Sequence, residues 1–171
     1  DALNIDLTQL CDALRAIVAN LPYNIATPLI INWLRDIYQN PKSLTSMSVM
    51  VQKEVAQRIT AQANTKAYGR LSIISQWLCD VRMMFDLPPS AFTPPPKVTS
   101  TVIQFVPKAL AGEQPAFDDV GKVTAAAFGQ RRKMIRSSLK DYAHKFDALG
   151  LDGQKRAENL DIQDFIALAQ D

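Results

Sequence analysis

The alternation of apolar and polar positions along the chain predicts an α/β region followed by a helical one. Short apolar runs rich in Ile and Val are typical of buried strands in parallel sheets, and such a run lies at 15–20. Further strands are predicted at 47–51, 81–85 and 99–106. Apolar residues at helical spacing predict helices over 27–37, 53–61 and 71–78. Strands that alternate with helices are typical of an α/β fold.

A proline-rich segment separates the last two predicted strands. Residues 87–96 read Leu-Pro-Pro-Ser-Ala-Phe-Thr-Pro-Pro-Pro. Proline lacks an amide donor and restricts the residue before it, so regular structure is excluded here. We expect a stiff connection between neighbouring strands that fixes one side chain, Phe92, in place.

Residues 107–115 are a predicted linker, and helical spacing continues beyond them. Five apolar residues fall within about one third of a helical wheel: Phe128, Ile135, Leu139, Tyr142 and Phe146. Arg132, Lys133, Arg136 and Lys140 occupy the neighbouring arc. We therefore expect two domains, 1–108 with an α/β fold and 109–171 with a small all-α fold.

Composition and charge narrow the class of protein. The 171 residues are 47% hydrophobic and 21% charged, which is typical of a globular chain. The net charge is only +2, yet residues 131–145 carry +5, so the remainder carries −3. This asymmetry indicates a phosphate-binding surface in one segment, although a solvated helix face would give the same pattern.

The cysteines and the single histidine exclude a zinc site. Cys11 and Cys79 lie far apart without metal-ligand spacing, and His144 has no partner pattern. We expect both cysteines to be buried in a reducing compartment. No stretch approaches the roughly 20 apolar residues of a membrane span, and the first residues do not resemble a signal peptide. The expected location is the cytoplasm.

The segment Asn20-Leu21-Pro22-Tyr23 carries the most specific chemistry. It follows an apolar run and precedes a predicted helix. The Asn20 amide oxygen and a Leu21 carbonyl fixed by Pro22 can accept the protons of an exocyclic amino group. The Tyr23 ring can stack on the base, and Phe92 can close on its other face. A strand end with a proline turn and a core tyrosine is the alternative interpretation.

Several motifs together resemble one family. Asn20–Tyr23 is followed by Gln52-Lys53-Glu54-Val55, by Ala67–Ser72, by Pro88–Val98 and by Phe128–Lys133, in that order. The chain resembles the bacterial small-subunit ribosomal RNA adenine N6-dimethyltransferases, the RsmA/KsgA family, over essentially its whole length. The resemblance implies the C-terminal part of a Rossmann-like class I methyltransferase sheet, followed by a helical RNA-binding domain.

The resemblance also implies a reaction and site residues. Members use S-adenosylmethionine to dimethylate N6 of two adjacent adenines of small-subunit ribosomal RNA, in a pre-ribosomal particle. Asn20, Leu21, Pro22, Tyr23 and Phe92 match the catalytic and stacking positions. Asp1, Ala2 and Asn20 match positions near the cofactor. In this context we interpret the following cations as RNA contacts: Lys97, Arg131, Arg132, Lys133, Arg136 and Lys140.

The chain departs from the family at the cofactor. Its six glycines are too far apart for the glycine-rich turn that such enzymes use. We expect an N-terminally truncated fragment that binds the cofactor weakly alone and has an unpaired edge on the strand at 15–20. Two alternatives stay open, a non-catalytic RNA- or ribosome-binding module and a macrolide-resistance-type enzyme acting on large-subunit RNA.

Overall fold

The computed structural model describes residues 15–170 and divides into two compact units. The sheet unit holds the residues up to Thr60 together with Leu78–Ala109, and the helical unit holds Ala61–Trp77 together with Leu110–Asp171. The predicted domain boundary at 108/109 remains a prediction, and one of the three divisions between the units, at 109/110, falls beside it. The difference from the expected domains is segment 61–77, whose contacts lie mainly with the helical unit.

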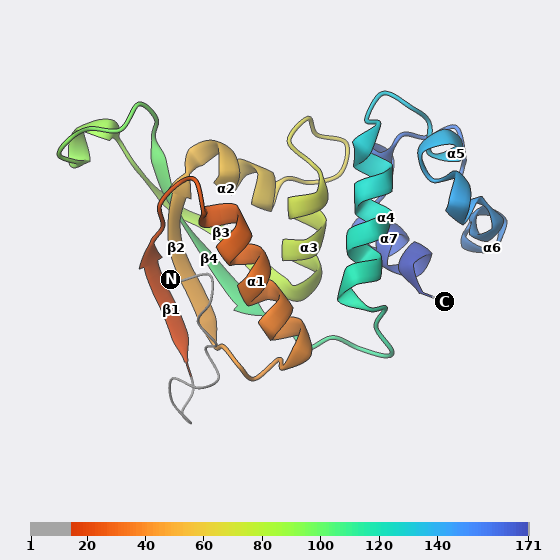
Figure 1. Cartoon of the computed structure of the whole chain (residues 1–171), viewed down its shortest axis with the longest axis horizontal. Helices are drawn as coiled ribbons and strands as arrows, with labels where there is room; N and C mark the ends of the chain where they lie inside the picture. The colour runs from red at the N-terminus through yellow and green to blue at the C-terminus, as the bar shows by residue number, and fades with distance from the viewer. Residues whose placement is uncertain (1–14, 171) are drawn as a thin grey trace. The chain divides into compact units, whose positions relative to one another are not determined.

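The sheet unit is built on one four-stranded mixed sheet in the order β1-β2-β4-β3. Its strands are β1 (Ala16–Asn20), β2 (Ser46–Gln52), β3 (Cys79–Leu87) and β4 (Ser100–Pro107). β1 runs parallel to β2, with Asn20 beside Met50, whereas β4 is antiparallel to both of its neighbours (Figure 1). All four predicted strands are confirmed.

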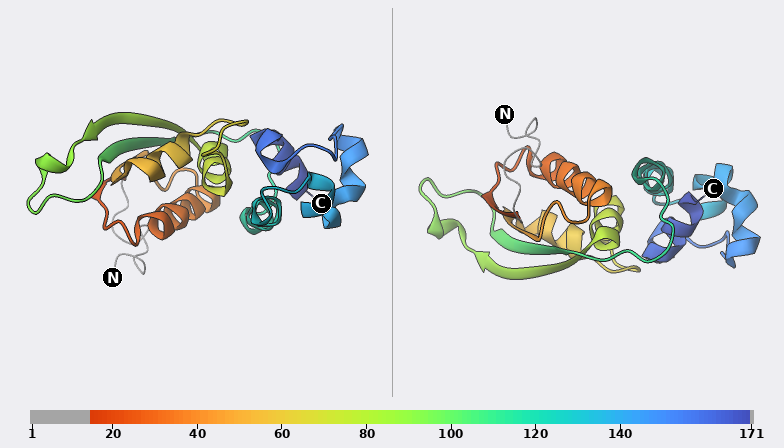
Figure 2. Two further views of the ribbon diagram at one scale, coloured as in Figure 1. Left: turned by 90° about the horizontal axis from the view of Figure 1, so that it is seen from above. Right: turned by 90° about the horizontal axis from the view of Figure 1, so that it is seen from below.

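Two helices cover one face of this sheet. Helices α1 (Ala26–Gln39) and α2 (Lys53–Thr60) lie on the same side of it (Figure 2). Apolar residues at helical spacing fall on one face of each helix. That face packs on the strands and is removed from water, which explains the pattern that predicted the helices. The core they share includes Leu29, Ile30, Leu34, Met47, Val49, Ile59, Ile103 and Phe105, all buried.

One expectation for β1 is wrong. The run at 15–20 is predicted to be a buried strand, yet Val18 is 86% exposed. β1 is the terminal strand of the described sheet, and exposed residues alternate with half-buried ones along it. An edge strand covered on one face buries only every second side chain. The expected unpaired edge of this strand agrees with its terminal position in the described sheet.

The helical unit packs around aromatic side chains. It contains most of α3 (Arg70–Leu78), then α4 (Phe117–Gly129), α5 (Ile135–Ser138), α6 (Phe146–Leu149) and α7 (Ile162–Ala169). The Phe128 ring lies 5.6 Å from that of Phe165, and Tyr68 contacts Phe128 edge-on at 6.1 Å between centroids. Aromatic pairs of this kind stabilise the fold through their ring geometry, in addition to the burial of apolar area.

The prediction of a continuous helix through residues 128–146 is wrong. α4 ends at Gly129, and the backbone turns before α5 begins. The Ile135 and Arg136 amides donate to the carbonyls of Lys155 and Gly153, at 2.8 and 3.1 Å. These amides therefore bond to a distant segment instead of a preceding helical turn. The apolar residues at helical spacing are nevertheless buried, since Ile135 and Leu139 lie in the core.

Other expectations concern the cysteines, metals and membranes. Cys79 is buried as expected, and burial raises the pKa of its thiol to about 12, whereas Cys11 lies outside the described residues. Within residues 15–170, no cluster of three or more His, Cys, Asp or Glu side chains could bind a metal ion. The helices of the same part are all too short or too polar to cross a bilayer.

Candidate functional site

A pocket of about 300 Å³ lies in the sheet unit, where the end of β1 meets the proline-rich loop. Every residue of the predicted base-binding set lines it, namely Asn20, Leu21, Pro22, Tyr23 and Phe92, together with Met50, Pro94 and Pro96. Residues more than 70 positions apart therefore share one cavity. The geometric part of the expectation, a single cavity beside Asn20, is confirmed, while the roles of these residues remain predictions.

The turn after β1 is fixed by the backbone of its neighbours. The Leu21 amide donates to the carbonyl oxygen of Met50 at 3.4 Å, and the Leu21 side chain is only 6% exposed. The Ile25 amide donates to the Pro22 carbonyl at 3.1 Å, which closes the turn before α1. Asn20 is the last residue of β1 and is exposed, so its carboxamide is accessible. Proline and two backbone bonds thus orient this segment.

The Tyr23 ring is fixed at its hydroxyl end. Tyr23 Oη and Ser100 Oγ share a hydrogen bond of 2.7 Å, and Ser100 is fully buried at the start of β4. Because the hydroxyl is already bonded, the ring contributes its aromatic surface to the pocket. No sequence pattern indicated Ser100, since its partner lies 77 positions away.

Phe92 is presented by the proline-rich loop. Contrary to the expectation of no regular structure, a short 3-10 turn forms at Pro89–Ala91, and the Phe92 amide donates to the Pro89 carbonyl at 3.2 Å. Proline favours this first helical position because its missing amide proton is not needed there. The loop connects two adjacent strands, as predicted, and these strands are antiparallel. Aromatic rings and an accessible carboxamide on one cavity suit a flat heteroaromatic ligand with donors on its edge.

Three polar side chains meet where this loop leaves the sheet. Lys53 Nζ donates to Asp86 Oδ2, and Thr101 Oγ1 donates to Asp86 Oδ1, each at 2.6 Å. The hydrogen bonds from Lys53 and then from Thr101 lower the pKa of the Asp86 carboxyl. No sequence pattern indicated Asp86 or Thr101, and Lys53 belongs to a family motif without an assigned role. Asp86 and Thr101 lie opposite each other on β3 and β4. Pairing the two predicted strands as a hairpin in this register would have placed the two residues together.

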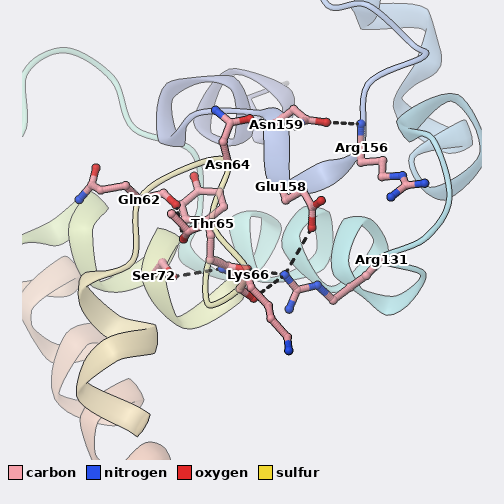
Figure 3. A network of polar contacts seen from close by, with 11 residues as sticks. Gln62, Asn64, Thr65, Lys66, Ser72, Arg131, Arg156, Glu158 and Asn159 are labelled. Atoms are coloured by element: carbon pink, nitrogen blue, oxygen red, sulfur yellow. Dashed lines mark hydrogen bonds and ion pairs between the residues drawn. The ribbon is translucent and has the colours of Figure 1, made fainter. Parts of the chain in front are cut away.

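The predicted RNA-contacting cations differ in their surroundings, beginning with Arg131. Arg131 Nη2 donates to the carbonyl oxygens of Lys66 and Tyr68, both at 3.0 Å, and lies 3.6 Å from a carboxylate oxygen of Glu158 (Figure 3). Its guanidinium carbon also lies 5.7 Å from the centre of the Phe128 ring. Arg131 therefore joins three segments of the helical unit, and its contact with RNA remains a prediction.

The remaining predicted cations are exposed. Arg132 and Lys133 lie in the turn after α4, Arg136 in α5 and Lys140 in the 3-10 segment Lys140–Lys145. A hollow of about 440 Å³ is lined by residues 128–133. Lys97 is exposed in the proline-rich loop of the sheet unit. Asp1 and Ala2, expected near a cofactor, lie outside the described residues.

Comparisons with known proteins agree on one family. The family model described as ribosomal RNA adenine dimethylase matches residues 2–170. A ribosomal RNA small subunit methyltransferase A from Rhodospirillum rubrum is 50% identical over 99% of this chain and 59% of that protein. Proteins of the same name from Rhodopseudomonas palustris and Caulobacter vibrioides are 49% and 48% identical. This chain covers 61% and 65% of them, so it spans about three fifths of its curated relatives.

Two solved structures have a similar fold. A dimethyladenosine transferase from Plasmodium falciparum superimposes with a TM-score of 0.74 at 26% identity, over 95% of this chain and 68% of that one. The 23S rRNA methyltransferase ErmE superimposes with a TM-score of 0.64 at 20% identity, over 98% and 68% of the two chains. The predicted fold class, an α/β sheet of the Rossmann-like methyltransferase type, is confirmed.

Proposed function

Because the chain belongs to the ribosomal RNA adenine dimethylase family, we propose that its pocket binds an adenine of ribosomal RNA and presents N6 for methylation. The observation that carries this proposal is the convergence of Asn20, Leu21, Tyr23 and Phe92 on one cavity of about 300 Å³. That volume is at the lower end of small-molecule sites. It suits a single base turned out of its stack.

The amide and carbonyl oxygens of Asn20 and Leu21 would accept the two N6 protons. The nitrogen of an aryl amine is a poor nucleophile, because its lone pair is delocalised into the ring. Hydrogen bonds to two fixed acceptors favour a pyramidal nitrogen with an available lone pair. Alignment and electrostatic preorganisation then provide the catalysis. The bond from the Leu21 amide to Met50 fixes the backbone that carries one acceptor.

Tyr23 and Phe92 would supply the stacking surfaces. Stacking of a base on an aromatic ring contributes about 1–3 kcal/mol and does not depend on base identity. Ser100 restricts the Tyr23 ring, and the stiff loop restricts Phe92. Little side-chain freedom is therefore lost on binding, which favours affinity.

S-adenosylmethionine is the methyl donor that we propose for the reaction, since it supplies an electrophilic methyl group when bound. The described residues fit it only in part. Asn20 lies at the pocket, but none of the residues that line the pocket is a glycine or an acidic residue. A glycine-rich turn and a carboxylate for the ribose are the usual features of such a cofactor site. We therefore assign only the base side of the reaction to residues 15–170.

The RNA partner that we propose is small-subunit ribosomal RNA in a pre-ribosomal particle. Relatives at 48–50% identity are named small subunit methyltransferases, whereas the likeness to a 23S enzyme, at 20% identity, concerns the fold alone. The exposed cations Arg132, Lys133, Arg136 and Lys140 also favour a phosphate-binding role for the helical unit. RNA binding without catalysis is therefore the second candidate function.

The substitution Asn20→Ala tests catalysis against binding. The experiment uses a protein that carries this chain within the full length of its relatives, and it measures methyl transfer to ribosomal RNA together with RNA affinity. We expect methyl transfer to fall by about 10²–10³-fold and RNA affinity to change by less than about twofold. Unchanged methyl transfer would overturn the catalytic proposal and leave the RNA-binding one. Asn32→Ala, an exposed asparagine on α1, is the matched control.

A further inference from the structure

The loop that presents Phe92 is bonded at both of its ends to one residue, Lys53. The Lys53 amide donates to the carbonyl of Thr99, which precedes β4, at 3.0 Å. The Lys53 ammonium donates to Asp86, near the end of β3, at 2.6 Å. Lys53 is the first residue of α2, directly after β2. A single residue thus ties both loop stems to the strand that also carries Met50 of the pocket.

The stems need such a constraint because the sheet is irregular just before the loop. The pairing of β3 with β4 shifts between Met83 and Phe85, and a shift of this kind bends a strand and increases its twist. β3 is also the terminal strand on its side of the described sheet. The prolines make the loop stiff, so a small rotation of its stems is transmitted to Phe92 instead of being absorbed.

We infer that Lys53 is a positioning residue, whose bonds to Asp86 and Thr99 set the orientation of the proline-rich loop and so of Phe92 over the base pocket. This inference rests on the proposed function, since it assumes that Phe92 stacks on a base. Thr101 supports the same carboxylate from the side of β4, with a hydrogen bond of 2.6 Å. The ion pair is exposed, and exposed pairs contribute little to folding stability. Its main effect is therefore expected on loop orientation.

A direct contact between Lys53 and an RNA phosphate is the competing explanation. Substitutions of Asp86 separate the two, because they act with opposite signs. Asp86→Ala removes a negative charge and releases the ammonium of Lys53. Electrostatic attraction alone then predicts tighter RNA binding, whereas a positioning role predicts weaker stacking of the base.

The experiment follows the fluorescence of 2-aminopurine in a short single-stranded RNA that is titrated with the 171-residue chain. Phe92→Ala is expected to weaken the quenched complex by about 5- to 100-fold. Lys53→Met and Asp86→Ala are each expected to weaken it by about three- to tenfold, with a melting temperature within a few degrees of the parent chain. The exchanged pair Lys53→Asp with Asp86→Lys is expected to recover most of the loss.

A matched control comes from the neighbouring ion pair on α2. Glu54 and Arg58 form an exposed pair of 2.8 Å, so Glu54→Gln removes a comparable bond that does not touch the loop. It is expected to leave the titration within about twofold of the parent. If the Lys53 and Asp86 variants also stay within this range while Phe92→Ala does not, the positioning role is overturned.

The remaining outcomes are also decisive. Tighter binding by Asp86→Ala overturns the positioning role and favours the phosphate contact. Equal titrations for the parent and Phe92→Ala overturn the proposed base pocket itself, and the inference with it. Should Lys53→Met unfold, the Asp86→Ala variant and the exchanged pair decide the question, since both keep a side chain or a salt bridge at the start of α2.

Discussion

The base pocket of the sheet unit and the basic segment of the helical unit were predicted from equally short motifs, with unequal results. All five pocket residues line one cavity. In residues 131–145 the expected helix is broken, and Arg131, one of the five cations predicted there to contact RNA, is bonded within its own unit. The difference lies in what each prediction used. A strand end and prolines restrict the backbone locally, whereas a helical period leaves the partners of each side chain open.

Bonding within the helical unit, and not exposure, distinguishes Arg131 from the neighbouring exposed cations. Arg131 donates to two carbonyl oxygens and approaches Glu158, so its removal acts on folding. Arg132 and Arg136 are exposed and available to phosphates. Neighbours in sequence therefore have different expected effects, which the first two of the following measurements test, whereas the third concerns the loop beside the base pocket.

The largest effect is expected for charge reversal at the exposed cations. Arg132→Glu combined with Arg136→Glu should lower RNA affinity by about 10- to 100-fold at low salt and reduce the salt dependence, because fewer counterions are released. Binding isotherms at several salt concentrations measure both quantities. Lys122→Glu reverses a charge elsewhere on α4 and should have a much smaller effect. Equal losses for the two reversals would mean that the basic segment is no specific RNA contact.

An intermediate effect is expected for Arg131→Met. Hydrogen bonds from a charged donor to two carbonyls are lost, which should reduce the free energy of unfolding by about 1–2 kcal/mol. Urea denaturation measures this change. The matched variant Arg132→Met should stay within about 0.5 kcal/mol of the parent chain, since surface substitutions rarely do more. If both variants unfold at the same urea concentration, the distinction between these neighbours is lost.

The smallest effect is expected for acidification at Asp86. Hydrogen bonds from Lys53 and Thr101 lower the pKa of this carboxyl in the folded chain, so the ionised form is favoured by folding. The resulting stability is present above the unfolded pKa of about 3.9 and is lost as the pH falls through the lower folded value. Unfolding of the parent and of Asp86→Asn, compared at neutral pH and near pH 3, should show a difference that shrinks on acidification. A constant difference would assign the effect to packing.

The sequence was sufficient to predict the strands and helices of the sheet unit, but not which of their residues are exposed. Apolar spacing located α1 and the strands, because burial of one face imposes that spacing on the sequence. It could not show that β1 is a terminal strand, which leaves Val18 in water. The bond between Tyr23 and Ser100 was equally inaccessible, since it depends on the register of β4 against β2.

In the helical unit, apolar spacing predicted a continuous helix that does not form, and the reason is physical. Gly129 ends α4, and the amides of Ile135 and Arg136 bond to carbonyls near residue 154. Helical spacing predicts which side chains are buried, and Ile135 is buried. It does not predict which carbonyl each amide will meet, because that depends on a segment some 20 positions away. The ion pair of Glu54 with Arg58, four positions apart on α2, is by contrast a feature of local spacing alone.

The bond between Tyr23 and Ser100 divides affinity from selectivity in the proposed pocket. A tyrosine whose phenol is satisfied internally contacts any nucleobase through its π-surface alone, with no preference among purines. Discrimination between adenine and guanine then depends on the edge of the base. There the Asn20 and Leu21 oxygens would face either the exocyclic amine of adenine or the carbonyl of guanine. Guanine would bring its O6 lone pairs against two further oxygens, and that repulsion, more than any attraction to adenine, would exclude it.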